Sequence, residues 1–220
     1  MIRLLLLLFA GVALILLLGQ LLLPGIAADR ISSRVGRYGK VDSVSVHAWP
    51  AVQLLWGSGD SVTVRARSLS LTPAQAAKLI WEARGVDRMD FTAASVRLGP
   101  LRLTDARVRK RGSSLSAQAV AGQADVKTAL PRGLSVQLIR SEAGQVRVRA
   151  SGGLFGVGAT LQVVAAAREG KLLARPVSFP LERLSLTLFS DPHIYVEGVG
   201  ATLLDGTPPS YGLTMRARLR

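Results

Sequence analysis

Polar and apolar positions divide this chain into a continuous apolar N-terminus and a long body of short alternating runs. Residues Leu4 to Leu23 contain a single polar side chain, that of Gln20. From Val41 onward, apolar residues recur mostly at every second position, the period of a strand with one face against a core. The pattern therefore predicts an N-terminal hydrophobic helix followed by a body built mainly of strands.

The first two predicted strands are joined by a proline corner. Val41–Ala48 and Ser61–Leu71 both alternate, and Pro50 follows the first of them. Between them, Ala51–Trp56 is a short apolar run that we expect to form one or two helical turns. The apolar parity of the second strand changes near Ser68, which predicts a bulge or a bend there.

Helix signals occur at few places in the body. Thr72 has the character of an N-cap and Pro73 of a first helical residue, so the spacing that follows predicts a helix over Gln75–Arg84. Ala124–Leu130 is a candidate for a short second helix. Apolar residues in Asp29–Tyr38 have helical spacing, which predicts that the N-terminal helix extends into this segment.

The remaining runs read as strands separated by turn signals about ten residues apart, as in an antiparallel meander. They are Arg88–Leu98, Leu101–Lys110, Ser114–Ala121, Leu134–Arg140, Gln145–Ala150, Thr160–Ala167, Lys171–Phe179, Leu184–Phe189, His193–Val199 and Gly212–Arg220. The predicted fold class is α+β. After an N-terminal segment at residues 1–28, we expect one domain at residues 29–220, with a large curved antiparallel sheet wrapped around one or two helices.

The N-terminal segment bears on where the protein is located. As a helix, residues Leu4 to Leu23 would span about 30 Å, roughly a bilayer core, and they exceed the apolar region of a secretory signal. Ala27-Ala28 is a small-residue pair that a signal peptidase would accept, so a membrane anchor and a cleaved signal both stay open.

We expect the body in the cell envelope, on the extracytoplasmic side of the membrane. The sequence after the first segment contains no second apolar stretch long enough to span, and the body reads as an exported domain. Basic residues that follow the segment, such as Arg30 and Arg34, favour the opposite orientation. A cytoplasmic body on a reversed anchor is therefore the alternative.

Charge and cysteine content narrow the choice of partners. The chain has 28 basic and 14 acidic residues, a formal net charge of +14, which favours anionic partners. It has no cysteine, which excludes disulfides, thiolate metal sites and cysteine nucleophiles. In several predicted strands arginine recurs at every second position, so one face of each strand is basic and the other apolar. These strands contain Arg65/Arg67, Arg107/Arg109, Arg147/Arg149 and Arg216/Arg218/Arg220.

The two faces of these strands allow two interpretations. The basic face is either an ordinary solvated surface or a cationic exterior near anionic lipid. The apolar face is mostly small and aliphatic, which suits an alkyl chain and equally suits plain packing of a sheet on a helix.

Reactive side chains form no recognisable catalytic or metal site in the sequence. The two histidines, His47 and His193, lie far apart and have no partner at a metal-ligand spacing. The glycine-rich stretches at 57–59 and 152–158 precede strands, whereas a phosphate loop or nucleophile elbow leads into a helix. The acidic residues are scattered, and no nucleic-acid recognition motif is present. We therefore expect no enzymatic activity, no metal, no cofactor and no nucleic-acid partner.

The proline corner and its two strands resemble a known family. The order of a valine-alternating strand, an aromatic–proline corner, an apolar turn to glycine and a second alternating strand is similar to that of the LmeA-like phospholipid-binding proteins, which are bacterial envelope proteins. The matching segments are Val44–Pro50, Leu54–Gly57, Val62–Ala66, Phe91–Leu98, Leu101–Val108 and Ala124–Pro131. The resemblance covers about residues 25 to 205 by order of elements. It departs from the family at Ala51-Val52, where members commonly have bulkier residues.

The resemblance implies a fold similar to tubular lipid-binding domains. It also implies that the protein binds or transfers anionic phospholipid in an apolar groove between the sheet and a helix, and that it catalyses no reaction. An envelope scaffold without a lipid cavity and an envelope hydrolase are the alternatives. Trp49 and Trp56 are either core anchors or side chains at the bilayer surface. The candidate acyl-chain contacts are Leu54, Leu55, Trp56, Leu79, Ile80, Trp81, Leu161 and Val163, and the candidate headgroup contacts are Arg65 and Arg67.

Overall fold

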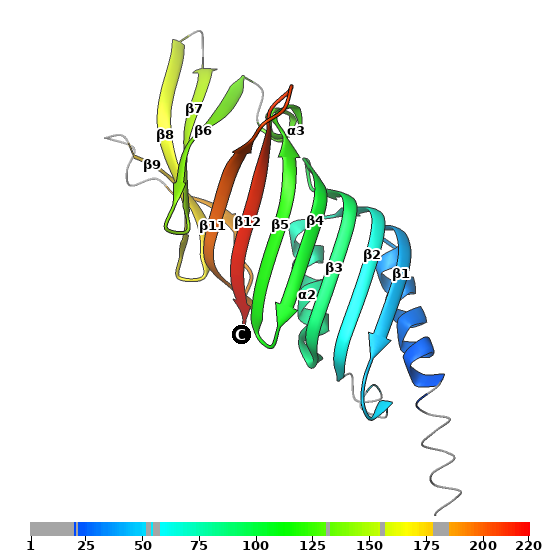
Figure 1. Ribbon diagram of the computed structural model, residues 1–220. Coiled ribbons are helices and arrows are strands. Elements are labelled where there is room, and N and C mark those ends of the chain that lie inside the picture. Colours follow the sequence, from blue (N-terminus) through cyan, green and yellow to red (C-terminus); the bar gives the residue numbers. More distant parts are fainter. Residues whose placement is uncertain are drawn as a thin grey trace, which may run out of the picture.

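Two β-sheets and a small number of helices make up the described part of the chain (Figure 1). The computed structural model describes residues 20, 22–51, 54, 58–130, 133–154, 157–177 and 185–220. The first of these residues form a helix over 22–36, which confirms that helical structure continues into the predicted segment. No helix within the described ranges is long and apolar enough to cross a membrane.

The larger sheet has seven strands, in the order β1-β2-β3-β4-β5-β12-β11. Their bounds are β1 Gly39–His47, β2 Gly59–Leu71, β3 Val86–Leu98, β4 Leu101–Arg111, β5 Ser114–Gly122, β11 Ile194–Leu204 and β12 Ser210–Leu219. Neighbouring strands run antiparallel except β2 and β3, which run parallel. Parallel pairing follows from α2 (Pro73–Glu82) and the 3₁₀ turn Ala83–Gly85, because a helical crossover returns the chain to the same end of the sheet.

The smaller sheet has five antiparallel strands, in the order β10-β9-β8-β7-β6. Their bounds are β6 Leu134–Glu142, β7 Gln145–Leu154, β8 Val157–Arg168, β9 Lys171–Pro176 and β10 Leu186–Phe189. The short helix α3 (Gln123–Ala129) lies between β5 and β6, and the last two strands of the chain return to pair beside β5. The α+β class is confirmed, but the strands divide into two sheets where the polarity pattern predicted one.

Helix α2 has the N-cap Thr72 and the first residue Pro73 that the sequence predicts, because a capping box satisfies N–H groups at its N-terminus. Thr72 Oγ1 accepts from the Gln75 N–H at 3.2 Å, and Gln75 Oε1 accepts from the Thr72 N–H at 2.8 Å. Pro73 occupies the first turn, where a missing N–H costs no hydrogen bond. Ala77 is buried, so the helix packs closely on the sheet.

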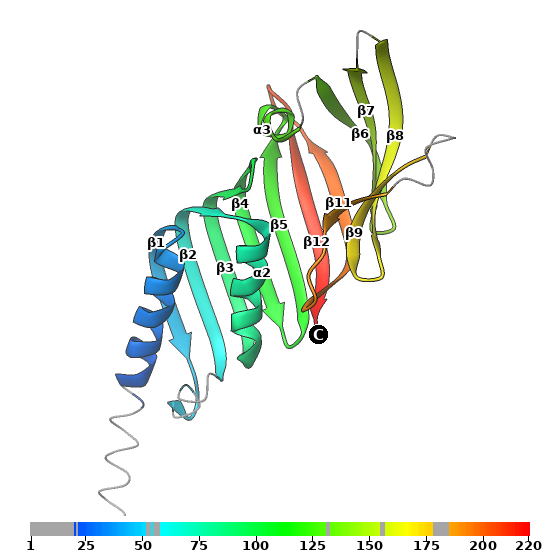
Figure 2. The same ribbon diagram turned by 180° about the vertical axis from the view of Figure 1, so that it is seen from behind.

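The N-terminal helix and α2 lie on the same face of the larger sheet (Figure 2). Val35 of the first helix and Leu79 of α2 pack against one cluster that includes Leu69 and Val96. Ile31 packs against this cluster and also against the valines of β1 and β2. The two helices therefore cover an apolar face of the sheet.

A double irregularity in the β1–β2 pairing reverses the parity of buried residues, as predicted near Ser68. The register shifts leave Asp42 and Arg67 without partners in the ladder, and these two side chains form an ion pair at 2.9 Å. Before this point Ala66 is buried, and after it Leu69 is buried. The bulge thus keeps apolar side chains under the helices while the strand twists.

Strand β11 would have a free edge if the smaller sheet did not cover it. The Gly170 carbonyl, in the β8–β9 turn, accepts from the Val196 N–H at 2.9 Å. The Gly144 carbonyl, in the β6–β7 turn, accepts from the Val199 N–H at 3.0 Å. Unpaired strand edges tend to pair with other chains, so these turns protect the edge and also fix where the smaller sheet sits.

The contact of Gly170 with Tyr195 provides a test of this docking. Gly170 has φ +79°, and a Cβ there would lie 2.3 Å from the Tyr195 ring. We predict that Gly170→Ala lowers the free energy of unfolding by about 1 kcal/mol for the backbone and about 1–3 kcal/mol more for the clash.

Gly112→Ala is the matched control for this prediction. Gly112 has φ +56° but has open space around its Cα, so only the backbone cost applies. Urea unfolding of both variants measures the difference. Equal losses in the two variants would show that the Tyr195 contact does not hold the smaller sheet.

Candidate functional site

One face of the smaller sheet is aliphatic because its cross-strand partners are aliphatic. Val148 of β7 lies opposite Leu138 of β6 on one side and opposite Val163 of β8 on the other. Ala150 lies opposite Leu161 in the next row of the same face. Residues directly opposite each other in a sheet share a face, so these side chains form one continuous surface, which we call the aliphatic face.

The aliphatic face is not covered by any part of the chain that the structure describes. Among the described side chains of β6–β10 none is buried, and those of Val148, Leu161 and Val163 are half-buried. Leu186, which lies opposite Ala174 at the β10 end, is 65% exposed. A contiguous apolar surface that is left partly exposed is a candidate interaction site.

At one end the aliphatic face reaches the core under α2. Phe189 of β10 lies opposite Leu172 of β9, and Leu172 lies opposite Ala167 of β8. Phe189 also packs against the buried cluster that Ile80 and Trp81 of α2 contact. The apolar surface of the smaller sheet is therefore joined to the packed interior of the larger one.

The arginines lie on the opposite faces of both sheets, as the arginine alternation predicts. In the larger sheet, Arg65 and Arg107 are exposed, while the alternating residues Val64 and Ala66 are buried toward the helices. In the smaller sheet, Arg149 lies opposite Gln162, on the side away from Val148 and Val163. Each sheet thus separates a cationic surface from an apolar one.

Ion pairs neutralise some of these arginines. Asp90 contacts Arg109 at 3.5 Å and Arg111 at 3.1 Å. The Arg218 guanidinium donates to the Glu197 carboxylate on the neighbouring strand, and this hydrogen bond raises the pKa of Arg218. These pairs are solvent-exposed, so they contribute little to stability, but they leave other arginines as the sources of net positive charge.

Lys110 is a buried charged residue that the sequence analysis did not identify. It follows the apolar parity of β4, and its side chain is 2% exposed. Its ammonium donates to the carbonyl of Arg84 at 3.3 Å and to that of Val86, where the chain leaves α2 for β3. Burial lowers the pKa of Lys110, and the nearby Asp87 carboxylate partly opposes that effect. A lysine at an apolar position was the signal available in the sequence.

The predicted acyl-chain contacts fall into separate parts of the structure. Leu54 packs with the valines of β1 and β2, and Leu79 packs against the cluster that includes Val35 of the N-terminal helix. Ile80 and Trp81 meet at the cluster that includes Phe189. Leu161 and Val163 lie on the aliphatic face of the smaller sheet.

Of the remaining predicted contacts, two lie outside the residues that the structure describes and two lie on the larger sheet. Leu55 and Trp56 lie outside the described residues. Arg65 and Arg67 are exposed on the face of the larger sheet away from the helices, and Arg67 is paired with Asp42. These two arginines are therefore not beside the aliphatic face.

The two histidines lie in different places, one in an aromatic stack and the other at the end of a strand. His193 stacks on Trp81 with ring centroids 4.0 Å apart, and His47 is exposed at the end of β1. Among the described residues no group of three histidine, aspartate or glutamate side chains is placed to hold a metal ion.

The comparison with protein families agrees with the resemblance noted in the sequence. The model of the family described as LmeA-like phospholipid-binding matches residues 18–212. The chain therefore belongs to the LmeA-like phospholipid-binding family, whose description names binding of phospholipid and no reaction. Neither the curated proteins nor the solved structures contain a match.

The lowered pKa of Lys110 makes the stability of the folded protein depend on pH. Because its pKa is lowered on folding, the unfolded chain binds a proton that the folded chain does not, at pH values between the folded pKa and the ordinary lysine pKa. Stability rises with pH wherever the unfolded state binds more protons. We predict that Lys110→Met removes this rise and, at neutral pH, costs about 1–3 kcal/mol because two carbonyls lose their charged donor.

Urea unfolding of the wild type and of Lys110→Met over a series of pH values measures both effects. Lys78→Met, at an exposed position of α2, is the control and is expected to keep the wild-type pH profile. Parallel pH profiles for wild type and Lys110→Met would contradict the prediction.

Proposed function

We propose that this protein binds phospholipid by placing the acyl chains on the aliphatic face of the smaller sheet. The observation that carries the proposal is that this face is aliphatic in consecutive rows and uncovered by the described residues. Membership of a phospholipid-binding family supports the class of ligand.

The chemistry of the face suits an alkyl chain. Valine, leucine and alanine side chains offer apolar area without directional contacts, and an alkyl chain needs only such area. Each methylene group removed from water contributes about 0.8 kcal/mol. Phe189 extends the surface toward Ile80 and Trp81, so these two predicted contacts border the proposed site.

The helix-covered face of the larger sheet is less suitable for an acyl chain. Val35, Ala77 and Leu79 occupy it and pack directly on the strands. For this reason we place the acyl chains on the smaller sheet, beside Leu161 and Val163, although the sequence predicted a groove between sheet and helix.

We further propose that the protein acts at a membrane of the cell envelope, with its body on the extracytoplasmic side. The apolar sequence Leu4–Leu23 precedes the first described helix. At the start of that helix Leu22 is 61% and Ile26 50% exposed, and Trp49 in the nearby β1–β2 connection is 76% exposed (Figures 1 and 2). Apolar and aromatic side chains at one end of a domain suit contact with a bilayer surface.

In this proposal the lipid is anionic, because the net charge is +14 and exposed arginines cover the opposite faces of both sheets. The function is binding or transfer, without catalysis. A protein scaffold that uses the aliphatic face for a partner chain, and an envelope hydrolase, are the alternatives that the experiments below distinguish.

A pair of variants on one strand tests the acyl-chain site. Val163 and its neighbour Gln162 point to opposite faces of β8. We predict that Val163→Asp reduces captured phospholipid about tenfold or more, because a carboxylate on the apolar face must be desolvated. Gln162→Asp adds the same charge on the polar face and is expected to leave capture within about twofold, because that charge stays hydrated.

The measurement is lipid capture by delipidated full-length protein. The protein is incubated with total bacterial membrane lipid, repurified and analysed by mass spectrometry, and circular dichroism checks the fold of each variant. No co-purifying phospholipid, or equal capture by both variants, would argue against the site. Released fatty acid or lysophospholipid would favour a hydrolase.

The membrane side is tested separately. We expect protease added to intact spheroplasts to digest the body, since an extracytoplasmic domain is accessible from outside. Protection of the body in intact spheroplasts, with digestion after lysis, would support the reversed orientation. A cytoplasmic marker protein controls for leakage.

A further inference from the structure

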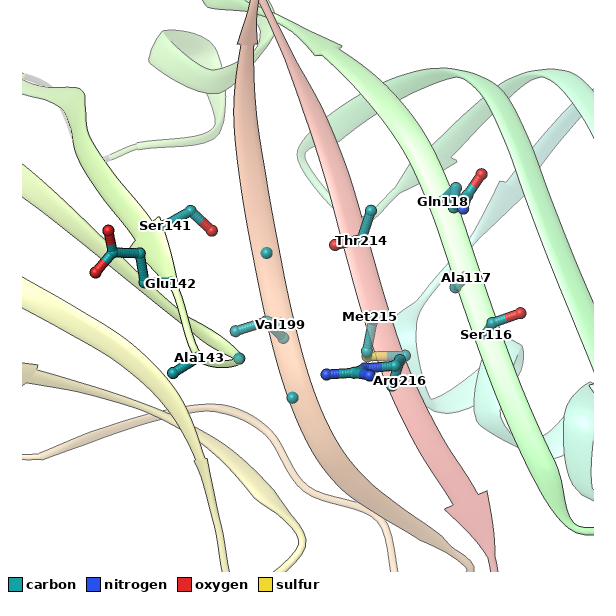
Figure 3. Close-up of a pocket in the computed structure, with 13 residues that line it drawn as sticks. Ser116, Ala117, Gln118, Ser141, Glu142, Ala143, Val199, Thr214, Met215 and Arg216 are labelled. Atoms are coloured by element: carbon teal, nitrogen blue, oxygen red, sulfur yellow. The ribbon is translucent and has the colours of Figure 1, made fainter.

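A hollow lined by both polar and apolar residues lies at the junction of the two sheets, on the face of the larger sheet away from the helices (Figure 3). It has a volume of about 340 Å³ and lies between β5, β12, β11 and the β6–β7 turn. Ser141 points toward β11, and Arg216 reaches across from β12, while the carboxylate of Glu142 points away from β11. The hollow is separate from the aliphatic face and from the packed core.

The hollow exists because β11 has glycine where a side chain would fill it. Gly198 lies opposite Arg216, and Gly200 lies opposite Thr214. A Cβ at Gly200 would lie 2.6 Å from Thr214 Oγ1 and 3.6 Å from Ser141 Oγ. The two glycines thus keep the outer surface of β11 bare at the place where the hairpin turn docks.

The position of the hairpin turn is fixed by two contacts with β11. The Ala201 N–H donates to Ser141 Oγ at 2.9 Å, and the Val199 N–H donates to the Gly144 carbonyl at 3.0 Å. A Cβ at Gly198 would lie 3.3 Å from Gly144 Cα, which shows how closely the two backbones approach. The wall of the hollow is therefore held in place by the backbone.

The polar part of the lining combines one positive charge with small hydrogen-bonding groups, and the apolar part consists of Ala117, Ala143, Val199 and Met215. Hydroxyl groups of Ser116, Ser141 and Thr214 and the amide of Gln118 surround it. Arg216 forms no ion pair within the described ranges, whereas Arg218 beside it is paired with Glu197. Glu142, the one acidic residue of the lining, is paired with Arg140.

From this arrangement we infer that the hollow is a binding site for a phosphate group. A planar guanidinium without an acidic partner matches two phosphate oxygens, and hydroxyl and amide groups donate to the others. The phosphate belongs either to a phospholipid headgroup or to a soluble phosphate ester, since both present the same oxygens. This inference stands independently of the acyl-chain site, because it uses the other face of the molecule.

Titration with inorganic phosphate at constant ionic strength tests the site. The full-length protein in a mild non-ionic detergent is titrated by calorimetry, with chloride as the balancing anion. Arg216→Gln is expected to weaken phosphate binding about tenfold or more, because it removes the charge-assisted hydrogen bonds. Arg88→Gln removes the same charge from an exposed position of β3 on the same face, outside the hollow, and is expected to change binding less than about twofold.

Gly200→Ala provides an independent variant that leaves every charge in place. Its methyl group would enter the hollow, and rotation of the Thr214 hydroxyl relieves the contact, so we expect the fold to be kept. Phosphate binding is expected to weaken about threefold or more because the methyl group occupies the space of the ligand. Unfolding curves for both variants confirm that they remain folded.

The outcomes separate the site from a general effect of positive charge. Absence of saturable binding to the wild type, or equal weakening by Arg216→Gln and Arg88→Gln, would overturn the inference. Unchanged binding by the Gly200→Ala variant would also overturn it. Once binding is measured, short-chain phosphatidylglycerol below its micelle concentration is added as a competitor. Displacement of bound phosphate by this lipid in the wild type would identify a lipid headgroup as the ligand, and no displacement would favour a soluble phosphate ester.

Discussion

The contact between the edge of β11 and the hairpin turns of the smaller sheet determines how the two parts of this protein are arranged. Backbone groups of Val196 and Val199 donate to glycine carbonyls in two different turns. A row of unsatisfied N–H groups at an edge strand costs free energy when it is removed from water, so these hydrogen bonds define the position of the second sheet. Tyr195 against Gly170 and Gly198 against Gly144 allow that position only because the glycines have no side chain.

Two surfaces of opposite character follow from this arrangement. The aliphatic face offers apolar area that the described chain leaves uncovered, and the arginines lie on the other side of the same strands. A phospholipid also joins an apolar and an anionic part. The proposed acyl-chain site and the proposed phosphate site lie on different faces, so the variants Val163→Asp and Arg216→Gln report on them separately.

The sequence predicted much of the local structure, and the reasons are local. Helix α2 was predicted because the side chains of Thr72 and Gln75 satisfy N–H groups of the first turn, and Pro73 has no N–H that needs a partner. The bulge near Ser68 was predicted because parity along one strand must change when the buried face changes. Lys110 was overlooked because a single lysine in an apolar row becomes informative only when the carbonyls of Arg84 and Val86 are seen beside it.

By itself, the sequence determined the family, the strand-rich α+β class, the capped helix and the division of strands into basic and apolar faces, because each depends on spacing along one segment. Only the tertiary structure decided that the strands form two sheets, that β12 lies between β5 and β11, and that Leu161 lies apart from Leu79 on an uncovered face. These features depend on pairing between segments distant in sequence. Alternation alone specifies which side of a strand is apolar and leaves its partner strand undetermined.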